Sequence, residues 1–262
     1  MNPNVDSFLN NFKFMACTAF GVTISVHAIQ VHAAELLVWS AGAAKVPFSE
    51  IVQAYQKTTG NTIKVDYAPV GVLVRKLSDG GKPGVLLISL DVIPDVERNG
   101  WTVSGSSTPV GSVGVGIAVK EGSPIPDISS PEALRTTLLN AKTITYMDPS
   151  KGTSGKHFAT VLSQLGIAEQ VKDKTTLGDA GFVVEPVARG EVELGIQQIT
   201  EILPVKGVQL VGPLPASLQK ITTYSIALGS HADNVGAAKD FMSFVRRDSS
   251  AAVFRAKGFS TP

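Results

Sequence analysis

Residues 148–157 combine glycine, hydroxyl and basic side chains in a pattern suited to holding an anion. The stretch joins an apolar run of strand length, residues 143–147, to a helical pattern that begins near Ser154. Backbone N–H groups at a helix start have no partner within the helix, and the helix dipole adds partial positive charge there. The stretch predicts a site for an oxyanion or a carboxylate, bound by Thr153, Ser154, Gly155 and Lys156. The alternative is that Ser154 only caps its own helix.

Two better-known motifs do not fit this stretch. A phosphate-binding P-loop requires G-x-x-x-x-G-K-[ST], but Ser150 stands five positions before Gly155 and His157 follows Lys156. A hydrolase nucleophile elbow requires G-x-S-x-G, and Lys156 occupies the closing glycine position. The sequence therefore favours neither a nucleotide site nor a serine nucleophile.

Strand-length apolar runs alternate with helical patterns along most of the chain. The first strands are predicted at 36–39, 62–67 and 85–89, each followed by a loop and a helix. Later strands are predicted at 143–147, 193–198, 208–211 and 222–228, and the last helices at 234–247 and 249–257. This alternation predicts an α/β fold with a parallel or mixed sheet covered by helices. Ligands of such sheets bind beyond the carboxyl ends of the strands.

Two extended segments, at 113–120 and 222–228, separate an earlier and a later part of this pattern. They predict two α/β lobes joined by two crossing strands, with a ligand cleft between the lobes. Lobe 1 would comprise residues 34–115 plus 226–262, and lobe 2 residues 116–225. Loops at Gly42, Gly71 and Thr153 would then face one another across the cleft. The alternative is a single larger α/β domain, because periodicity does not fix lobe boundaries.

The N-terminal segment, residues 1–33, has the pattern of a cleaved secretory signal. Its apolar run, residues 14–29, is short and interrupted by polar residues, which suits a signal better than a membrane-spanning helix. Val31 and Ala33 supply the small residues that cleavage requires, after Ala33 or one residue later. We therefore expect a periplasmic protein. A lipoprotein signal at Cys17 is a weaker alternative, since most of the apolar run follows that residue.

Composition excludes several other function classes. Cys17 is the only cysteine, so the mature chain would have no thiol and must be stabilised by its core. The formal net charge of +1 gives no indication of nucleic-acid binding or of an anionic membrane surface. After cleavage only His157 and His231 remain, far apart in the sequence, so no metal site is predicted.

The order and spacing of several short segments resemble the periplasmic molybdate-binding proteins, type II solute-binding proteins of ABC transporters. The resemblance covers the mature chain and implies the two-lobe fold of that family, with an anion held between the lobes. It is carried by residues 38–42, 73–77, 87–89, 148–155, 165–166, 195–196 and 257–259, together with Pro83.

The resemblance also implies where the ligand lies. That family holds its oxyanion with serines of the first two loops, with backbone N–H groups near Ser154 and Ala180, and with a tyrosine. Here the first-loop serine falls on Gly42 or Ala43, the second-loop serines on Val70 and Gly71, and the tyrosine on Gln198. Losing these donors disfavours molybdate, because a buried anion with too few partners is costly. A larger organic anion is indicated.

Within this scaffold, the chain resembles the bacterial aconitate isomerases, enzymes related to the molybdate-binding proteins. That resemblance implies a proton shift along an allylic unit, which requires no cofactor but needs a base near neutrality. His157 is the first candidate base, because a helix start favours the neutral imidazole, and Glu201 is the second. Binding of carboxylates is expected from Lys45 and Lys156, and a further contact from Tyr224.

The competing interpretation is a transport receptor without chemistry. It would close its lobes on a small anion and deliver it to a membrane permease, a partner that the enzyme does not need. Both interpretations predict a monomer.

Overall fold

The computed structural model describes residues 35–262, so the predicted signal segment lies outside the described residues. Its strands form one mixed sheet of nine strands. On one side of this sheet, β1 (Glu35–Ala41) pairs in parallel with β2 (Thr62–Ala68) and with β3 (Val85–Ser89). β9 (Ile221–Leu228) runs antiparallel to β3 and returns the chain to this side. These strands match the apolar runs that the sequence predicts, which confirms the α/β pattern.

The other side of the sheet is built in the same way around β5 (Ile144–Met147). This short strand pairs in parallel with β6 (Thr175–Gly178) and with β7 (Leu194–Gln198). β8 (Val208–Pro213) pairs with β4 (Thr108–Lys120). The carboxyl ends of parallel strands on both sides therefore carry loops that can contribute to one site.

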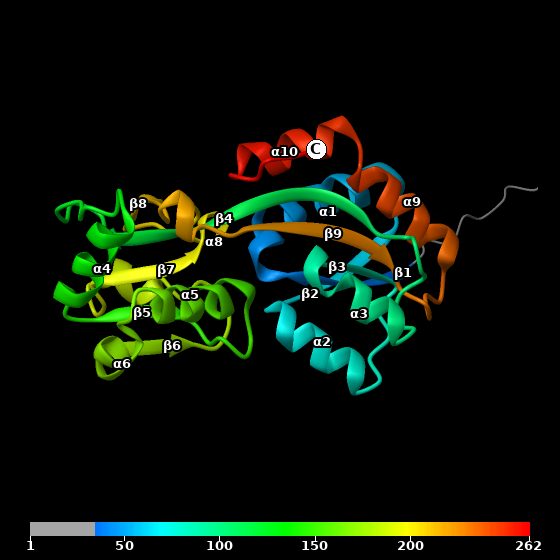
Figure 1. Ribbon diagram of the computed structural model, residues 1–262. Coiled ribbons are helices and arrows are strands. Elements are labelled where there is room, and N and C mark those ends of the chain that lie inside the picture. The colour runs from blue at the N-terminus through cyan, green and yellow to red at the C-terminus, as the bar shows by residue number, and fades with distance from the viewer. Residues whose placement is uncertain (1–34) are drawn as a thin grey trace, which may run out of the picture. The chain divides into compact units, whose positions relative to one another are not determined.

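A single long strand, β4, connects the two sides. Its first half pairs with β9 and its second half with β7 and β8, all antiparallel. Figure 1 shows β4 and β9 running side by side between the two groups of strands. Burial along β4 is almost continuous from Val113 to Val119, as expected for a strand covered on both faces.

Two large hydrophobic cores lie on either side of this crossing. The first draws on buried residues from Leu36 to Val113 and from Tyr224 to Phe259. The second draws on residues from Val115 to Leu218. The core therefore changes within two residues of β4, between Val113 and Val115, where the strand passes from one group to the other.

Helices cover the sheet and begin at the carboxyl ends of the strands (Figure 1). α1 (Lys45–Thr59) follows the short 3₁₀ turn η1 (Gly42–Ala44) and ends at Gly60, which adopts a left-handed conformation with φ 74°. A second 3₁₀ turn, η2 (Leu90–Val92), precedes α3. The remaining helices are α2 (Val70–Ser78), α3 (Ile93–Arg98), α4 (Pro131–Asn140), α5 (Thr153–Gln164), α6 (Ala168–Val171), α7 (Glu185–Ala188), α8 (Ile199–Ile202), α9 (Val235–Val245) and α10 (Asp248–Ala256).

The helix boundaries differ from the sequence prediction in two places that matter for the site. The sequence predicts Gly71 in a loop, but α2 already begins at Val70, and Pro69, which is extended, is its N-cap. α5 begins at Thr153, one residue before the predicted start at Ser154. Within the described residues, no helix is long and apolar enough to cross a membrane.

Candidate functional site

The segments at the carboxyl ends of five strands, β1, β2, β5, β6 and β7, enclose a cavity that β9 also borders. The volume open to the centres of water-sized molecules is about 70 Å³. A buried water needs about 10–15 Å³ on this measure, so there is room for roughly five waters or one compact ligand. The cavity is lined by Ala41, Gly42, Ala43, Lys45, Tyr67, Ala68, Pro69, Val70, Met147, Gly152, Thr153, Ser154, Gly181, Phe182, Glu201 and Tyr224.

Three helix starts meet at this cavity without a side chain to cap them. η1 and α1 begin beside Gly42, α2 begins at Val70 and α5 at Thr153, and all of these residues line the cavity. None of these starts has a side-chain cap or an acidic residue in its first turn. By contrast, Ser130 caps α4 and Asn234 caps α9. Uncapped N–H groups and aligned dipoles give the cavity a positive potential without many cations, which suits an anion.

Glu201 brings a buried carboxyl group to the same cavity. It lies on α8, the turn that follows β7, and is only 7% exposed. None of the ion pairs among residues 35–262 includes Glu201. Burial raises the pKa of this carboxyl to about 8, and a hydrogen bond from Gln197 opposes part of the rise. Near neutral pH the group can therefore both donate and accept a proton.

The opposite wall approaches the Glu201 carboxyl closely at Gly42. A Cβ atom added to Gly42 would lie 3.1 Å from Glu201 Oε1, which is tighter than ordinary contact. Glycine at the first loop, where the family resemblance leads one to expect a serine, leaves room for the carboxyl group of Glu201.

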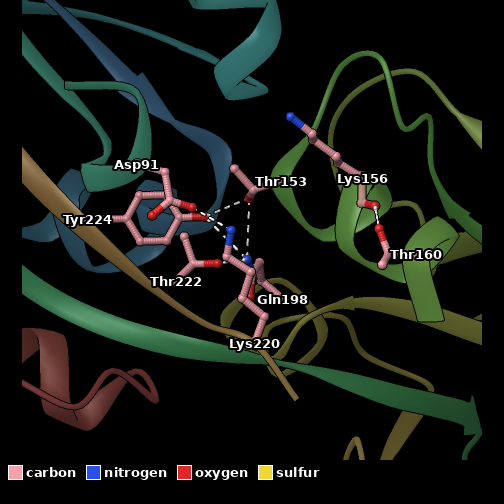
Figure 2. Close-up of polar contacts among 8 residues, drawn as sticks. All are labelled: Asp91, Thr153, Lys156, Thr160, Gln198, Lys220, Thr222 and Tyr224. Atoms are coloured by element: carbon pink, nitrogen blue, oxygen red, sulfur yellow. Dashed lines mark hydrogen bonds and ion pairs between the residues drawn. The ribbon is translucent and has the colours of Figure 1, made fainter. Parts of the chain in front are cut away.

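A network of hydroxyl groups and one amide forms another part of the wall. Tyr224 lies on β9, and its hydroxyl is 3.3 Å from Thr153 Oγ1 (Figure 2). The amide of Gln198 donates to both hydroxyls and to Thr222 from behind the wall. Burial, and secondarily the charge of Glu201, raises the pKa of Tyr224 far above its ordinary value. Tyr224 therefore stays protonated and acts as a hydrogen-bond donor.

One cation and two aromatic rings line the remaining wall. Lys45 is exposed at the first turn of α1, and its Nζ lies 5.6 Å from the centre of the Phe182 ring. Tyr67 is the second-to-last residue of β2, and its hydroxyl lies 2.8 Å from Ser49 Oγ. Sequence reasoning did not identify Tyr67 or Phe182. Tyr67 could have been found, because it is an aromatic residue at the carboxyl end of a predicted strand. No motif in the sequence around Phe182 indicates a place in the site.

The structure brings together eight of the residues predicted for the site. Those that line the cavity are Gly42, Ala43, Lys45, Val70, Thr153, Ser154, Glu201 and Tyr224. Gln198 lies directly behind them, in contact with Thr153 and Tyr224.

His157, the first candidate base, is not brought to the cavity. Its Nε2 donates to the carbonyl oxygen of Leu218 at 2.8 Å, so this nitrogen carries a proton and holds a backbone turn. The physical reason is its position one helical turn beyond Thr153, where the ring meets the 216–218 segment rather than the cavity. A structural role explains this histidine without chemistry.

Four other predicted contacts also lie off the cavity wall. The N–H of Gly71 already donates to the carbonyl of Lys151 at 2.8 Å, and Gly155 is packed under the backbone of Met147. Lys156 is exposed and lines a neighbouring cleft instead. Ala180 is exposed as well, and its neighbours Gly181 and Phe182 reach the cavity in its place.

The raised pKa of Glu201 predicts a pH-dependent effect on stability. The carboxyl binds its proton more tightly in the folded chain than in the unfolded chain, whose pKa is near 4.5. Folding stability should therefore fall as the pH rises from about 4.5 to about 8. Glu201→Gln removes the group whose deprotonation lowers the folding stability. The substitution should therefore stabilise the protein by a few kcal/mol at pH 8.5 and by much less at pH 5. Urea unfolding at both pH values measures the difference; an equal difference at both would contradict the assignment.

Comparison with known proteins places this fold and site in a family. The sequence pattern of the family described as bacterial extracellular solute-binding protein matches residues 36–260. An aconitate isomerase from a Pseudomonas species is 29% identical over 233 residues, which cover 85% of this chain and 86% of that protein. The molybdate-binding protein ModA of Escherichia coli is 23% identical over 230 residues, covering 86% of this chain and 89% of that protein.

Solved structures share the fold at lower sequence identity. The periplasmic molybdate-binding protein of Azotobacter vinelandii superimposes with a TM-score of 0.73 at 16% identity, covering 87% of this chain and 99% of that chain. The sulfate-binding protein SubI of Mycobacterium tuberculosis superimposes with a TM-score of 0.70 at 17% identity, covering 87% of each chain. The two-lobe α/β fold predicted from the sequence is thus confirmed, and the chain belongs to the bacterial extracellular solute-binding protein family.

Proposed function

We propose that this chain is a periplasmic aconitate isomerase that interconverts trans- and cis-aconitate by an allylic proton shift. The observation that carries the proposal is Glu201, a buried carboxyl group without an ionic partner among the described residues, facing a cavity where three uncapped helix starts meet. In a receptor, the charged form of a buried acid would repel an anionic ligand and weaken its binding as the pH rises. A proton-transfer enzyme requires such a group.

The substrate is a tricarboxylate, and the cavity offers separate partners for its charges. The helix starts at Val70 and Thr153 supply backbone N–H groups, and Lys45 supplies a cation. Tyr224 and the Thr153 side chain supply hydroxyl donors beside them. These groups hold the carboxylates and orient the carbon chain toward Glu201.

The proton shift then needs a single acid–base group. The Glu201 carboxylate removes a proton from the methylene carbon, and the electron pair of that C–H bond forms the new double bond. The electron pair of the old double bond then forms a C–H bond at the alkene carbon farther from the methylene group. Glu201 supplies the proton for this bond. Negative charge that spreads onto the substrate carboxylates in between is stabilised by the hydroxyl and N–H donors. Atoms and charge balance without another reactant.

This assignment predicts how turnover depends on pH. The base must be deprotonated to start the reaction, and the Glu201 pKa is about 8. We therefore expect kcat/KM for trans-aconitate to rise with pH and to level off above about 8, since this ratio reports the free enzyme. Initial rates between pH 5.5 and 9.5 measure the profile. A rate that is flat across this range would contradict Glu201 as the base.

Incubation of the purified protein with trans-aconitate tests the function itself. The protein is recovered from the periplasm, transferred to metal-free buffer and mixed with trans-aconitate, and cis-aconitate is followed by proton NMR. N-terminal sequencing of the same sample tests removal of residues 1–33. Formation of cis-aconitate is the expected result. Binding of trans-aconitate without any conversion would contradict the isomerase.

The second candidate function is a substrate-binding protein of an ABC transporter that delivers an oxyanion or organic anion to a permease. It is supported by the similarity to ModA and to a substrate-binding lipoprotein, YvgL, of Bacillus subtilis, which is 25% identical over 229 residues. Calorimetric titration with molybdate in parallel with the aconitate assay separates the two. Tight molybdate binding with no turnover would favour the receptor, and size-exclusion chromatography would test the expected monomer.

A further inference from the structure

The amide of Gln198 lies behind the cavity wall and contacts three hydroxyl groups. Gln198 ends β7 and is 1% exposed. Its Nε2 lies 3.2 Å from Thr222 Oγ1 and 3.4 Å from both Thr153 Oγ1 and Tyr224 Oη (Figure 2). Thr153 and Tyr224 line the cavity, whereas Gln198 does not. Gln198 can therefore influence a bound molecule only through these hydroxyls.

The direction of these hydrogen bonds decides what the hydroxyls offer to a ligand. An amide nitrogen only donates, whereas a hydroxyl oxygen both accepts and donates. The two hydrogens on Nε2 are shared among three hydroxyl oxygens, and where they engage the lone pairs of Thr153 and Tyr224, the hydrogens of those hydroxyls remain for other partners. The contact between the two hydroxyls, at 3.3 Å, uses only one of these hydrogens. At least one is left for the cavity, and an anion can attract both.

The other end of the amide shows what this orientation costs. Gln198 Oε1 is buried and has no hydrogen-bond partner among the residues that the structure describes. Turning the amide around would place Oε1 against the hydroxyls, where it would accept their hydrogens and leave lone pairs facing the cavity. The observed orientation leaves an acceptor unsatisfied but keeps donors on the cavity side, as an anion requires.

We propose that Gln198 is a positioning residue that makes the hydroxyls of Thr153 and Tyr224 hydrogen-bond donors toward an anion in the cavity. The inference rests on the proposed function to the extent that it requires an anionic ligand. It assigns Gln198 a part in selecting charged over neutral ligands, although the residue does not line the cavity.

Two nearly isosteric substitutions test the proposal. Gln198→Glu replaces the amide donor with a carboxylate that accepts hydrogen bonds from the hydroxyls. Gln198→Met removes both the donor and the acceptor while filling about the same space. We expect the Kd for trans-aconitate to rise about threefold in Gln198→Met and about thirtyfold in Gln198→Glu. Isothermal titration with trans-aconitate, repeated with molybdate, gives the affinities, and circular dichroism checks the fold. Equal affinities of the two variants, or tighter binding by Gln198→Glu, would overturn the proposal.

A double-mutant cycle separates this role from a merely structural one. If Gln198 acts through the Tyr224 hydroxyl, the loss caused by Gln198→Glu should be at least threefold smaller in a Tyr224→Phe protein. Should Gln198→Glu not fold, Gln198→Met combined with Tyr224→Phe tests the same coupling. Additive losses in affinity would contradict the proposal in either pair. Absence of aconitate turnover by the wild-type protein would contradict the proposed function alone, since the molybdate titrations test Gln198 independently.

Discussion

Glu201→Gln should reduce the turnover of trans-aconitate by at least about 10³-fold and change its Kd by no more than about threefold. Glutamine has the size of glutamate and keeps the hydrogen bond with Gln197 possible, but it cannot take up a proton. Near neutral pH, Glu201 is largely uncharged, because burial raises its pKa to about 8, so the substitution removes little charge from the cavity. Single-turnover NMR measures the rate, and isothermal titration measures the binding.

A matched substitution at the surface controls for indirect effects. Glu121 is exposed just beyond β4, away from the cavity, and Glu121→Gln should leave both turnover and binding unchanged. If Glu201→Gln kept more than about a tenth of the wild-type rate, Glu201 would not be the acid–base group. Loss of binding and turnover together would instead assign Glu201 to ligand binding.

The sequence predicts the framework of the site well because that framework is local. Apolar runs of strand length followed by glycine and hydroxyl residues place Gly42, Val70 and Thr153 at strand ends. Parallel strands bring such loops to one edge within each group of strands. The meeting of the two groups depends on the long strands β4 and β9 that join them. The uncapped helix start at Thr153, which we propose binds an anion, follows from the same local pattern, and its first turn holds no acidic residue.

The sequence alone could not decide between the two candidates for the proposed acid–base group, because burial is a property of tertiary packing. Both His157 and Glu201 lie near the start of a helix that follows a predicted strand. α8 packs against η1 and β4, which buries the carboxyl of Glu201 beneath the first loop. α5 instead presents His157 to the carbonyl of Leu218, a residue far away in the sequence. Only the folded chain shows which of the two side chains faces the cavity.

The role of Gly71 also depends on tertiary packing that the sequence does not show, because this glycine makes a contact across the cleft rather than a turn. It lies in the first turn of α2, and its N–H donates to Lys151 in the loop before α5. Arg75, one turn later, donates to the carbonyl of Ser150 at 3.1 Å. These two bonds join α2, which packs on the first core, to the loop that precedes α5 in the second. They close one edge of the cavity over its helix starts.

Gly71→Ala should therefore weaken the binding of trans-aconitate at least about tenfold while destabilising the unliganded protein by no more than about 2 kcal/mol. A Cβ atom at Gly71 would lie 2.7 Å from the carbonyl oxygen of Lys151 and 2.9 Å from that of Ser150. Both are backbone atoms that cannot rotate away, so the loop must move back and both bonds across the cleft are lost. Alanine is the better helix former by about 1 kcal/mol, so α2 itself should be no less stable.

Binding and stability measured together distinguish this closure effect from general damage. Titration calorimetry should show the higher Kd, while thermal unfolding without ligand should show a Tm lowered by only a few degrees. Gly236→Ala is the matched control, since Gly236 lies near the start of α9 and a Cβ atom there meets only Asn234 Oδ1, at 3.5 Å. Gly236→Ala should neither raise the Kd for trans-aconitate nor lower the Tm. Unchanged affinity in Gly71→Ala would mean that the ligand binds without the contacts between α2 and the 148–152 loop. The closed cavity described above would then not be the state that binds the ligand.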